Sequence, residues 1–205
     1  MKNIIIFAIF VTVISCTNQT SDNSSSNGLA TKRPSIKDTL LQQCIHENDT
    51  IINEANAVNY VIIDSFYTLK VKIGGLDTLL PYQFDCSVPR GLVPSIHSYY
   101  KNTICLMRGH GFDYREFVIG YVNNNQIVLK QYEIGLIADL KNDIVVYRNY
   151  NQLEKIIVED IKKENKKTFI IPSNLATTGI SSAAILKGRL QVKFSDGRVT
   201  TFALR

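Results

Sequence analysis

The sequence lacks the short motifs by which several common enzyme classes are recognised. It has no HExxH motif, no P-loop and no GxSxG nucleophile elbow. None of its four cysteines forms a CxxC pair, so the spacing does not support a zinc cluster. We therefore expect neither a bound metal nor a cofactor, and no motif assigns an activity.

The sequence also lacks a long hydrophobic run near its start. The apolar stretch from Ile4 to Ile14 is eleven residues long, and Thr12 is its only polar residue. As a helix it would extend about 17 Å, whereas the hydrocarbon core of a bilayer is about 30 Å thick. A short apolar core behind Lys2 is instead typical of a secretory signal peptide. We expect residues 1–15 to be this peptide.

The apolar stretch ends in Val13-Ile14-Ser15-Cys16, which resembles the lipobox of bacterial lipoproteins. That motif has an aliphatic residue, a tolerant position, a small residue and then an invariant cysteine. The resemblance covers only the first sixteen residues and identifies no family for the rest of the chain. It implies a thioether-linked diacylglycerol on Cys16, cleavage before this residue and acylation of the new amino group. The alternative is a buried N-terminal strand that ends in cysteine.

A polar tether is expected after the lipid site. Residues 16–34 are rich in Ser, Asn and Thr, and such a composition cannot bury enough apolar surface to order itself. As a flexible chain it would reach roughly 23 Å. Thr17 stands where some lipoproteins carry an aspartate that retains them in the inner membrane, and Asp22 is the only acidic residue of the tether. The resemblance thus implies the cell envelope, at the outer membrane and facing the periplasm.

The charge of the chain is mildly basic, with a formal net charge of +5. The basic residues are scattered, apart from a cluster within residues 162–167. Nucleic-acid binding requires a basic face with interleaved aromatic residues, so we expect no nucleic-acid partner.

The cysteines left after lipidation of Cys16 are odd in number, so at least one thiol stays unpaired. We prefer a disulfide between Cys86 and Cys105, because both lie in strand-like surroundings at modest separation. The alternative is that no disulfide forms, since a free cysteine is a common small core residue. Cys44 fits that alternative, on the apolar face of a predicted helix.

The hydrophobic pattern predicts one α+β domain over residues 35–205, built on a mostly antiparallel sheet. Apolar residues at helical spacing predict a helix over 36–46, resuming over 51–57, and another over 152–164. Alternating patterns predict strands over 60–64, 67–73, 102–107, 116–122, 126–134, 144–148, 169–171, 190–194 and 199–204. Gly74-Gly75, Asn123-Asn124-Asn125 and Asp196-Gly197 predict turns, and 173–184 a loop. The alternative fold is a β-sandwich or barrel with added helices.

The candidates for catalysis are His110 and Asp113, which lie in the glycine-flanked loop Gly109–Tyr114. Glycines let the backbone turn tightly, and a histidine beside a carboxylate can act as a general base or metal ligand. The alternative is a surface connection with a solvated histidine. His46 and His97 are distant in the sequence, and no spacing predicts that the three converge.

The candidates for binding are aromatic residues in two connections. The segment Pro81–Tyr100 is expected to be a long irregular loop, and such loops often carry binding surfaces. We expect it to form one face with the Gly109–Tyr114 loop and to meet a partner or ligand there. The alternative is that the aromatic residues cap the core. The candidates are Tyr82, Tyr99, Tyr100, Phe112 and Tyr114.

These observations favour a lipid-anchored, non-enzymatic envelope protein that binds a protein partner or ligand. The membrane contact would be made by the N-terminal lipid. One alternative is an envelope-anchored hydrolase or metal-dependent enzyme that uses the Gly109–Tyr114 loop. Another is a structural protein of the membrane surface.

Overall fold

A computed structural model of the chain describes residues 50–64 and 66–204, which belong to one unit spanning residues 34–205. The predicted signal peptide, Cys16, the tether, the helix over 36–46, Cys44 and His46 lie outside the described residues.

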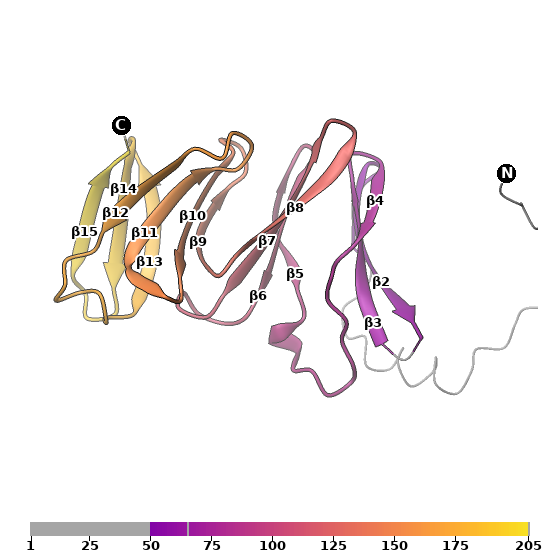
Figure 1. Cartoon of the computed structure of the whole chain (residues 1–205), viewed down its shortest axis with the longest axis horizontal. Coiled ribbons are helices and arrows are strands. Elements are labelled where there is room, and N and C mark those ends of the chain that lie inside the picture. The colour runs from indigo at the N-terminus through magenta and orange to yellow at the C-terminus, as the bar shows by residue number, and fades with distance from the viewer. Residues whose placement is uncertain (1–49, 65, 205) are drawn as a thin grey trace, which may run out of the picture. The chain divides into compact units, whose positions relative to one another are not determined.

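The described residues form fifteen strands and one short 3-10 helix, η1 (Arg90–Leu92), and they run in chain order through four antiparallel sheets (Figure 1). The first sheet contains β1 (Thr50–Asn53), β2 (Asn56–Ile63), β3 (Phe66–Ile73) and β4 (Leu76–Leu79). The second contains β5 (Ser95–Tyr100), β6 (Thr103–Arg108), β7 (Glu116–Asn123) and β8 (Gln126–Tyr132). The third contains β9 (Ile134–Asp139), β10 (Ile144–Asn149), β11 (Gln152–Asp160) and β12 (Lys166–Ile170). The fourth contains β13 (Ile180–Leu186), β14 (Arg189–Phe194) and β15 (Val199–Ala203).

Three hydrophobic clusters hold successive sheets together, so the second and third sheets are buried on both faces. On β7, Val118 belongs to the cluster shared with the first sheet, and the neighbouring Phe117 belongs to the cluster shared with the third. On β10, Val145 and Val146 likewise enter different clusters. Each sheet follows the simple meander order in which neighbouring strands are consecutive in sequence. An architecture of successive antiparallel sheets does not by itself define a function.

The helix expected over 152–164 is wrong, because residues 152–160 form strand β11. Its apolar residues match helical spacing, but Ile156 packs in the cluster between the third and fourth sheets and Ile157 in the cluster between the second and third. A strand with two buried faces carries consecutive apolar residues and loses its alternation. The pattern therefore imitated that of a helix.

The α+β assignment is wrong as well, since the described part of the chain is nearly all β. Residues 51–57, where a helix was expected to resume, belong to β1, a tight turn and β2. The alternative fold fails too, because the strands form four separate sheets rather than two packed sheets or one closed sheet.

The predicted strands and turns are confirmed where alternation or turn chemistry was strong. Asn124 and Asn125 both have positive φ, and they connect β7 to β8 in a two-residue hairpin. Gly74 and Gly75 do the same between β3 and β4. Gly197 has a φ of 88° in the turn before β15. Residues with positive φ are favoured in these turns because they match the twist of the strands.

Several strands lie where none was expected, or only part of one, and β4 is among them. The segment 173–184 was expected to be a loop, but β13 begins at Ile180 and pairs with β14. The irregular segment Pro81–Tyr100 ends earlier than expected, because β5 begins at Ser95. The expected strand over 126–134 is in fact β8 and the first residue of β9, separated by Glu133. Because the residues of this segment are mostly small and polar, no alternating pattern indicated β13, which is held by its pairing with β14.

Within residues 50–64 and 66–204, no helix has the length and apolar character needed to cross a membrane.

Candidate functional site

The two loops that carry the candidate residues contact each other. The backbone N–H of Gly109 donates to the carbonyl of Gly91 at 2.5 Å. The imidazole of His110 lies against Gly91 so closely that a Cβ at this position would overlap the ring. A side chain at Gly91 would therefore have to displace the ring of His110.

His110 and Asp113 point to different partners. Oδ1 of Asp113 accepts the backbone N–H of Ile180 at 3.3 Å and lies 3.7 Å from Nη1 of Arg148. His110 is exposed and packs on Gly91. No hydrogen bond or ion pair between described residues joins His110 to Asp113, so the structure does not form the acid–base pair considered from the sequence.

Arg148 fixes the Gly109–Tyr114 loop through its ion pair with Asp113. Its side chain is only 2% exposed, and its Nη2 group donates to the carbonyl oxygens of Leu153 and Ala176. Its Nε atom is buried and finds no acceptor in the described part of the chain. Burial lowers the pKa of Arg148, while the charge of Asp113 opposes this shift. Because a buried cation needs a counter-charge, Asp113 serves first as the ionic partner of Arg148.

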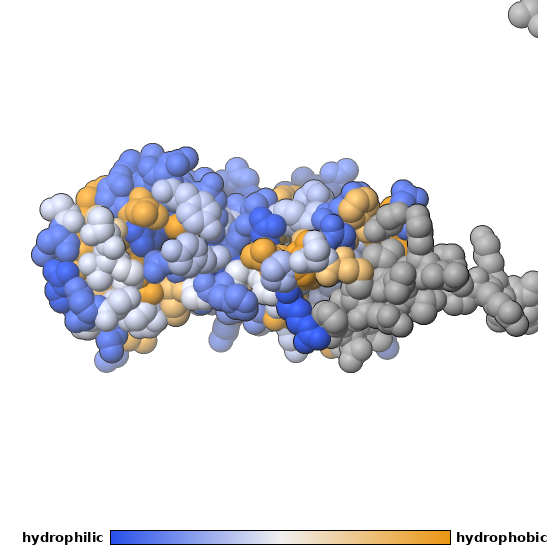
Figure 2. Space-filling view, turned by 90° about the horizontal axis from the view of Figure 1, so that it is seen from below, coloured by the Kyte–Doolittle hydropathy of each residue, from blue (hydrophilic) through white to orange (hydrophobic). Residues whose placement is uncertain are grey.

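Both residues of this ion pair line a pocket of about 260 Å³. Tyr114 and Tyr150 line the pocket, with exposed fractions of 75% and 49%. Leu153, which is also exposed, lines it as well. The remaining lining residues are Ile134, Ala176, Thr177, Thr178 and Gly179. Exposed aromatic residues around a small hollow are typical of protein-recognition sites. Figure 2 shows one face of the molecule, on which apolar residues form separate patches among polar ones.

Phe112 and Tyr82, two of the binding candidates, have packing roles. Phe112 packs at the edge of the third cluster, with the guanidinium of Arg115 3.8 Å from its ring centroid. The hydroxyl of Tyr82 donates to Oε1 of Glu116 at 3.3 Å, and Arg108 lies over its ring. Burial, aided by the charge of Glu116, raises the pKa of Tyr82 to about 12. These two aromatic side chains therefore do not form the exposed surface.

Tyr99 and Tyr100 lie at the other end of the β5–β6 hairpin from Gly91 and Gly109. Tyr99 pairs with Ile104 and Tyr100 with Thr103, beside the turn, whereas the loops meet near the start of β5. Tyr100 lines a different pocket, of about 320 Å³, which is rich in lysine. The five aromatic candidates therefore do not share one face.

The expected disulfide between Cys86 and Cys105 is wrong. Cys105 is a free thiol on β6, fully buried in the second cluster, and burial raises its pKa to about 12. Cys86 is disulfide-bonded. Strand-like surroundings suggested that the two were alike, but alternation on β6 directs Cys105 into the core.

The histidines within the described residues face different neighbours. His97 lies at a bulge in β5 and stacks on the ring of Phe117, with the centroids 5.1 Å apart. Its pKa is lowered by burial and by the charge of Arg115. Across residues 50–64 and 66–204, no group of three or more His, Cys, Asp or Glu side chains converges as a metal site would require.

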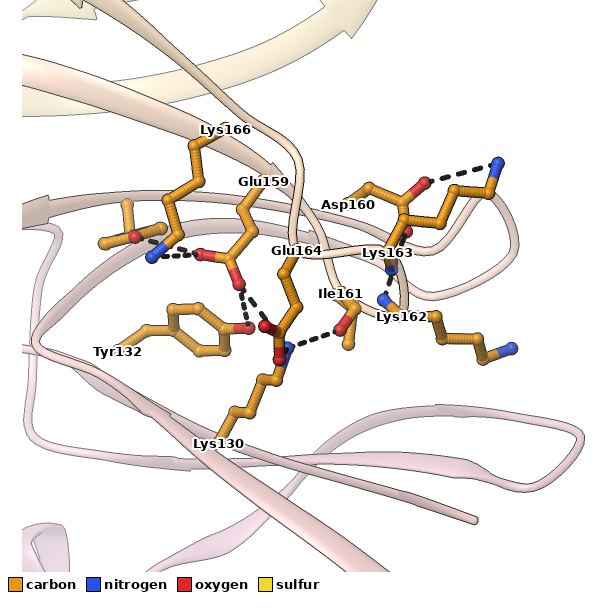
Figure 3. A network of polar contacts seen from close by, with 10 residues as sticks. Lys130, Tyr132, Glu159, Asp160, Ile161, Lys162, Lys163, Glu164 and Lys166 are labelled. Atoms are coloured by element: carbon orange, nitrogen blue, oxygen red, sulfur yellow. Dashed lines mark hydrogen bonds and ion pairs between the residues drawn. The ribbon is translucent and has the colours of Figure 1, made fainter. Parts of the chain in front are cut away.

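A second polar site surrounds Glu159 on β11 (Figure 3). Its carboxylate is buried, accepts hydrogen bonds from the hydroxyls of Tyr132 and Tyr147, and lies within 4 Å of the ammonium groups of Lys130 and Lys166. This network borders a cavity of about 660 Å³.

Sequence reasoning missed Arg148, Tyr150 and Glu159. Arg148 and Glu159 were taken as the end of a strand and as part of a helix, and neither position has a motif around it. The only signal was the occurrence of charged residues inside strongly apolar segments. Asp113 is 35 residues from Arg148 and Tyr132 is 27 residues from Glu159, so these two pairings could not be read from spacing.

No known protein-family model matches this chain, and no curated protein is significantly similar to it.

Proposed function

We propose that this chain is a lipid-anchored, non-enzymatic envelope protein that binds a protein partner at the Tyr114–Tyr150 pocket. The observation that carries the proposal is the exposure of Tyr114, Tyr150 and Leu153 around one small hollow. Exposing three large apolar groups together is unfavourable unless something covers them.

The size of the pocket favours a protein partner that inserts a single side chain. A volume of about 260 Å³ is below the usual range for small-molecule sites, which is about 300–1,000 Å³. Binding energy in protein interfaces concentrates on a few aromatic anchors and the pockets that they meet. Tyrosine offers a large contact area with few rotatable bonds, which suits the rim of such a pocket.

The ion pair between Asp113 and Arg148 fixes the loop that carries Tyr114. Asp113 joins the Gly109–Tyr114 loop to Ile180 in the fourth sheet and to Arg148 in the third. Gly179 leaves room for this carboxylate, because a Cβ there would lie 2.7 Å from Oδ2 of Asp113. A loop held at two points loses less conformational entropy on binding than a free one.

The anchor is proposed from the lipobox resemblance at Cys16. Two or more acyl chains bind a membrane firmly, whereas a single chain binds only marginally. A tether of residues 16–34 would let the domain reach roughly 23 Å from the membrane. We place the protein at the outer membrane, facing the periplasm.

The binding proposal is tested with the full-length protein in its native envelope. A photo-crosslinking amino acid replaces Tyr114 in one variant and Tyr99 in another, because Tyr99 is an exposed tyrosine at the far end of the β5–β6 hairpin. We expect crosslinking to one defined protein from position 114 and not from position 99. The purified partner should then bind at least tenfold more weakly to the Tyr114→Ala/Tyr150→Ala variant. Unchanged affinity in that variant, with the fold intact, would refute the proposed site.

The anchor is tested separately by mass spectrometry of the native polypeptide. We expect an N-terminal peptide that begins with acylated Cys16, and release of the Cys16→Ser variant from the membrane fraction. Retention of Met1, or an unmodified thiol at Cys16, would refute the anchor and leave the pocket proposal standing.

A further inference from the structure

The cavity beside Glu159 is distinct from the Tyr114–Tyr150 pocket and has a different chemistry. It has a volume of about 660 Å³ and lies between β8, the β10–β11 turn and the segment that follows β11. It is lined by two lysines, three glutamates, two tyrosines and four Asn or Gln residues. Nearly all of these side chains are polar, unlike the apolar lining of most small-molecule sites.

The charged groups of the cavity already neutralise one another. Nζ of Lys130 lies 2.8 Å from Oε1 of Glu164, and Nζ of Lys166 lies 3.3 Å from Oε2 of Glu159 (Figure 3). Glu133 accepts the backbone N–H of Tyr150 at 2.8 Å. With two lysines against three carboxylates, the lining has a formal charge of 2 − 3 = −1. An anion would have to displace these pairs against that charge, so the cavity does not favour one.

The groups left over for a ligand are neutral amides. The side chains of Asn149, Asn151 and Gln152 make no hydrogen bond to any residue that the structure describes, and these residues line the cavity. Gln131 pairs with Val118, so its side chain lies on the opposite face of β8 from Tyr132. Each amide has two N–H donors and one carbonyl acceptor. A hydroxyl group likewise donates once and accepts twice, so amides match hydroxyls better than they match ions of one sign.

The ionic network around Glu159 fixes the tyrosine and lysine side chains that line the cavity. The hydroxyls of Tyr132 and Tyr147 both donate to Glu159, and their rings pack with centroids 4.9 Å apart. Fixed side chains lower the entropic cost of binding a polar ligand, whose hydrogen bonds must otherwise offset the loss of water contacts.

We propose that this cavity binds a neutral, polyhydroxylic ligand of the saccharide class. The amides recognise its hydroxyl groups, while the Glu159 network fixes the tyrosine and lysine side chains that line the same cavity. This assignment concerns a different surface from the one proposed for the protein partner, and the two can fail independently.

The test uses the full-length protein in a detergent without a sugar headgroup, since a maltoside would compete. Maltotriose, cellotriose and chitotriose serve as neutral probes, with glucuronate and inorganic phosphate as charged comparators. Binding is followed by saturation-transfer NMR and calorimetry. We expect at least one neutral trisaccharide to bind with a Kd below about 10 mM, more tightly than either anion.

Two amides on different strands, Asn149 on β10 and Gln152 on β11, provide the decisive variant. Asn149→Ala/Gln152→Ala should weaken trisaccharide binding by roughly tenfold or more, because two hydrogen-bonding groups are lost. Its thermal unfolding should match that of the parent protein. Tyr114→Ala should leave saccharide affinity unchanged, which separates this site from the protein-binding pocket. The inference is overturned if no trisaccharide binds, if an anion binds more tightly, or if the amide variant binds as well as the parent.

Discussion

The hydroxyl of Tyr147 on β10 donates a 3.0 Å hydrogen bond to Oε2 of Glu159 on β11, inside a network that contains two lysines and a second tyrosine. The carboxylate of Glu159 is 4% exposed, so it has almost no contact with water. A carboxylate removed from water costs several kcal/mol unless hydrogen bonds and counter-charges replace its solvation. Glu159 has both, and the stability of this region should depend on its charge.

Glu159→Gln is therefore expected to destabilise the protein by about 3 kcal/mol, because Lys130, whose side chain is only 16% exposed, loses its buried carboxylate partner. Urea unfolding measures the change. The matched control is Glu164→Gln, which removes a carboxylate that pairs with the same Lys130 but is 69% exposed. The control should change stability by less than about 1 kcal/mol. Equal effects of the two substitutions would show that burial of Glu159 is not what matters.

Stability should fall in alkaline solution. Burial and the charge of Glu116 raise the pKa of Tyr82 to about 12, and burial also raises the pKa values of Tyr132 and Tyr147. Between pH about 10 and about 12 the unfolded chain loses tyrosine protons that the folded protein keeps. Below about pH 10 these tyrosines should not change the free energy of unfolding. As the pH rises from about 10 to about 12, the free energy of unfolding should decrease.

The contribution of Tyr82 can be isolated by measuring urea unfolding across this pH window. Tyr82→Phe should reduce the alkaline loss of stability, because phenylalanine has no proton to release. Tyr99→Phe, at an exposed position on β5, should leave the pH profile as it is in the parent protein. A Tyr82→Phe profile that overlays that of the parent would contradict the assignment.

The cysteines should differ sharply in reactivity. Cys105 is buried with a pKa raised to about 12, so a maleimide should label it only after unfolding. Cys86 is disulfide-bonded while Cys105 is free, which leaves Cys16 and Cys44 as possible partners. Because lipidation would occupy the sulfur of Cys16, we expect a Cys44–Cys86 bridge in non-reducing peptide maps. A Cys16–Cys86 peptide would contradict both the bridge and the lipid anchor.

Gly135 on β9 should be intolerant of any side chain. A Cβ at this position would run into the ring of Phe117, which is fully buried between the second and third sheets. Gly135→Ala should lower the free energy of unfolding by about 1–3 kcal/mol, as overpacking usually does. Ser182→Ala, an exposed position on β13, should change it by no more than about 0.5 kcal/mol. A thermal melt distinguishes the two, and an unchanged Gly135→Ala melt would mean that the sheets can move apart.

Alternation of apolar and polar residues and the residue types of tight turns were enough to predict several of the strands and turns. Tyr67, Leu69, Val71 and Ile73 alternate with polar residues and lie on β3. Asn124 and Asn125 tolerate positive φ and close the hairpin to β8. These features need only neighbouring residues, because a pleated strand places alternate side chains on one face and a turn depends on two dihedral pairs.

The sequence by itself determined where apolar and polar residues alternate, where the chain turns and which loop holds Asp113 and Tyr114. The tertiary structure alone decided that residues 152–160 are a strand, since two-sided burial and helical spacing place apolar residues alike. It also decided that Asp113 pairs with Arg148, thirty-five residues away, and that Glu159 lies between two tyrosines. Such contacts depend on how separate sheets stack, and no short stretch of residues encodes that packing.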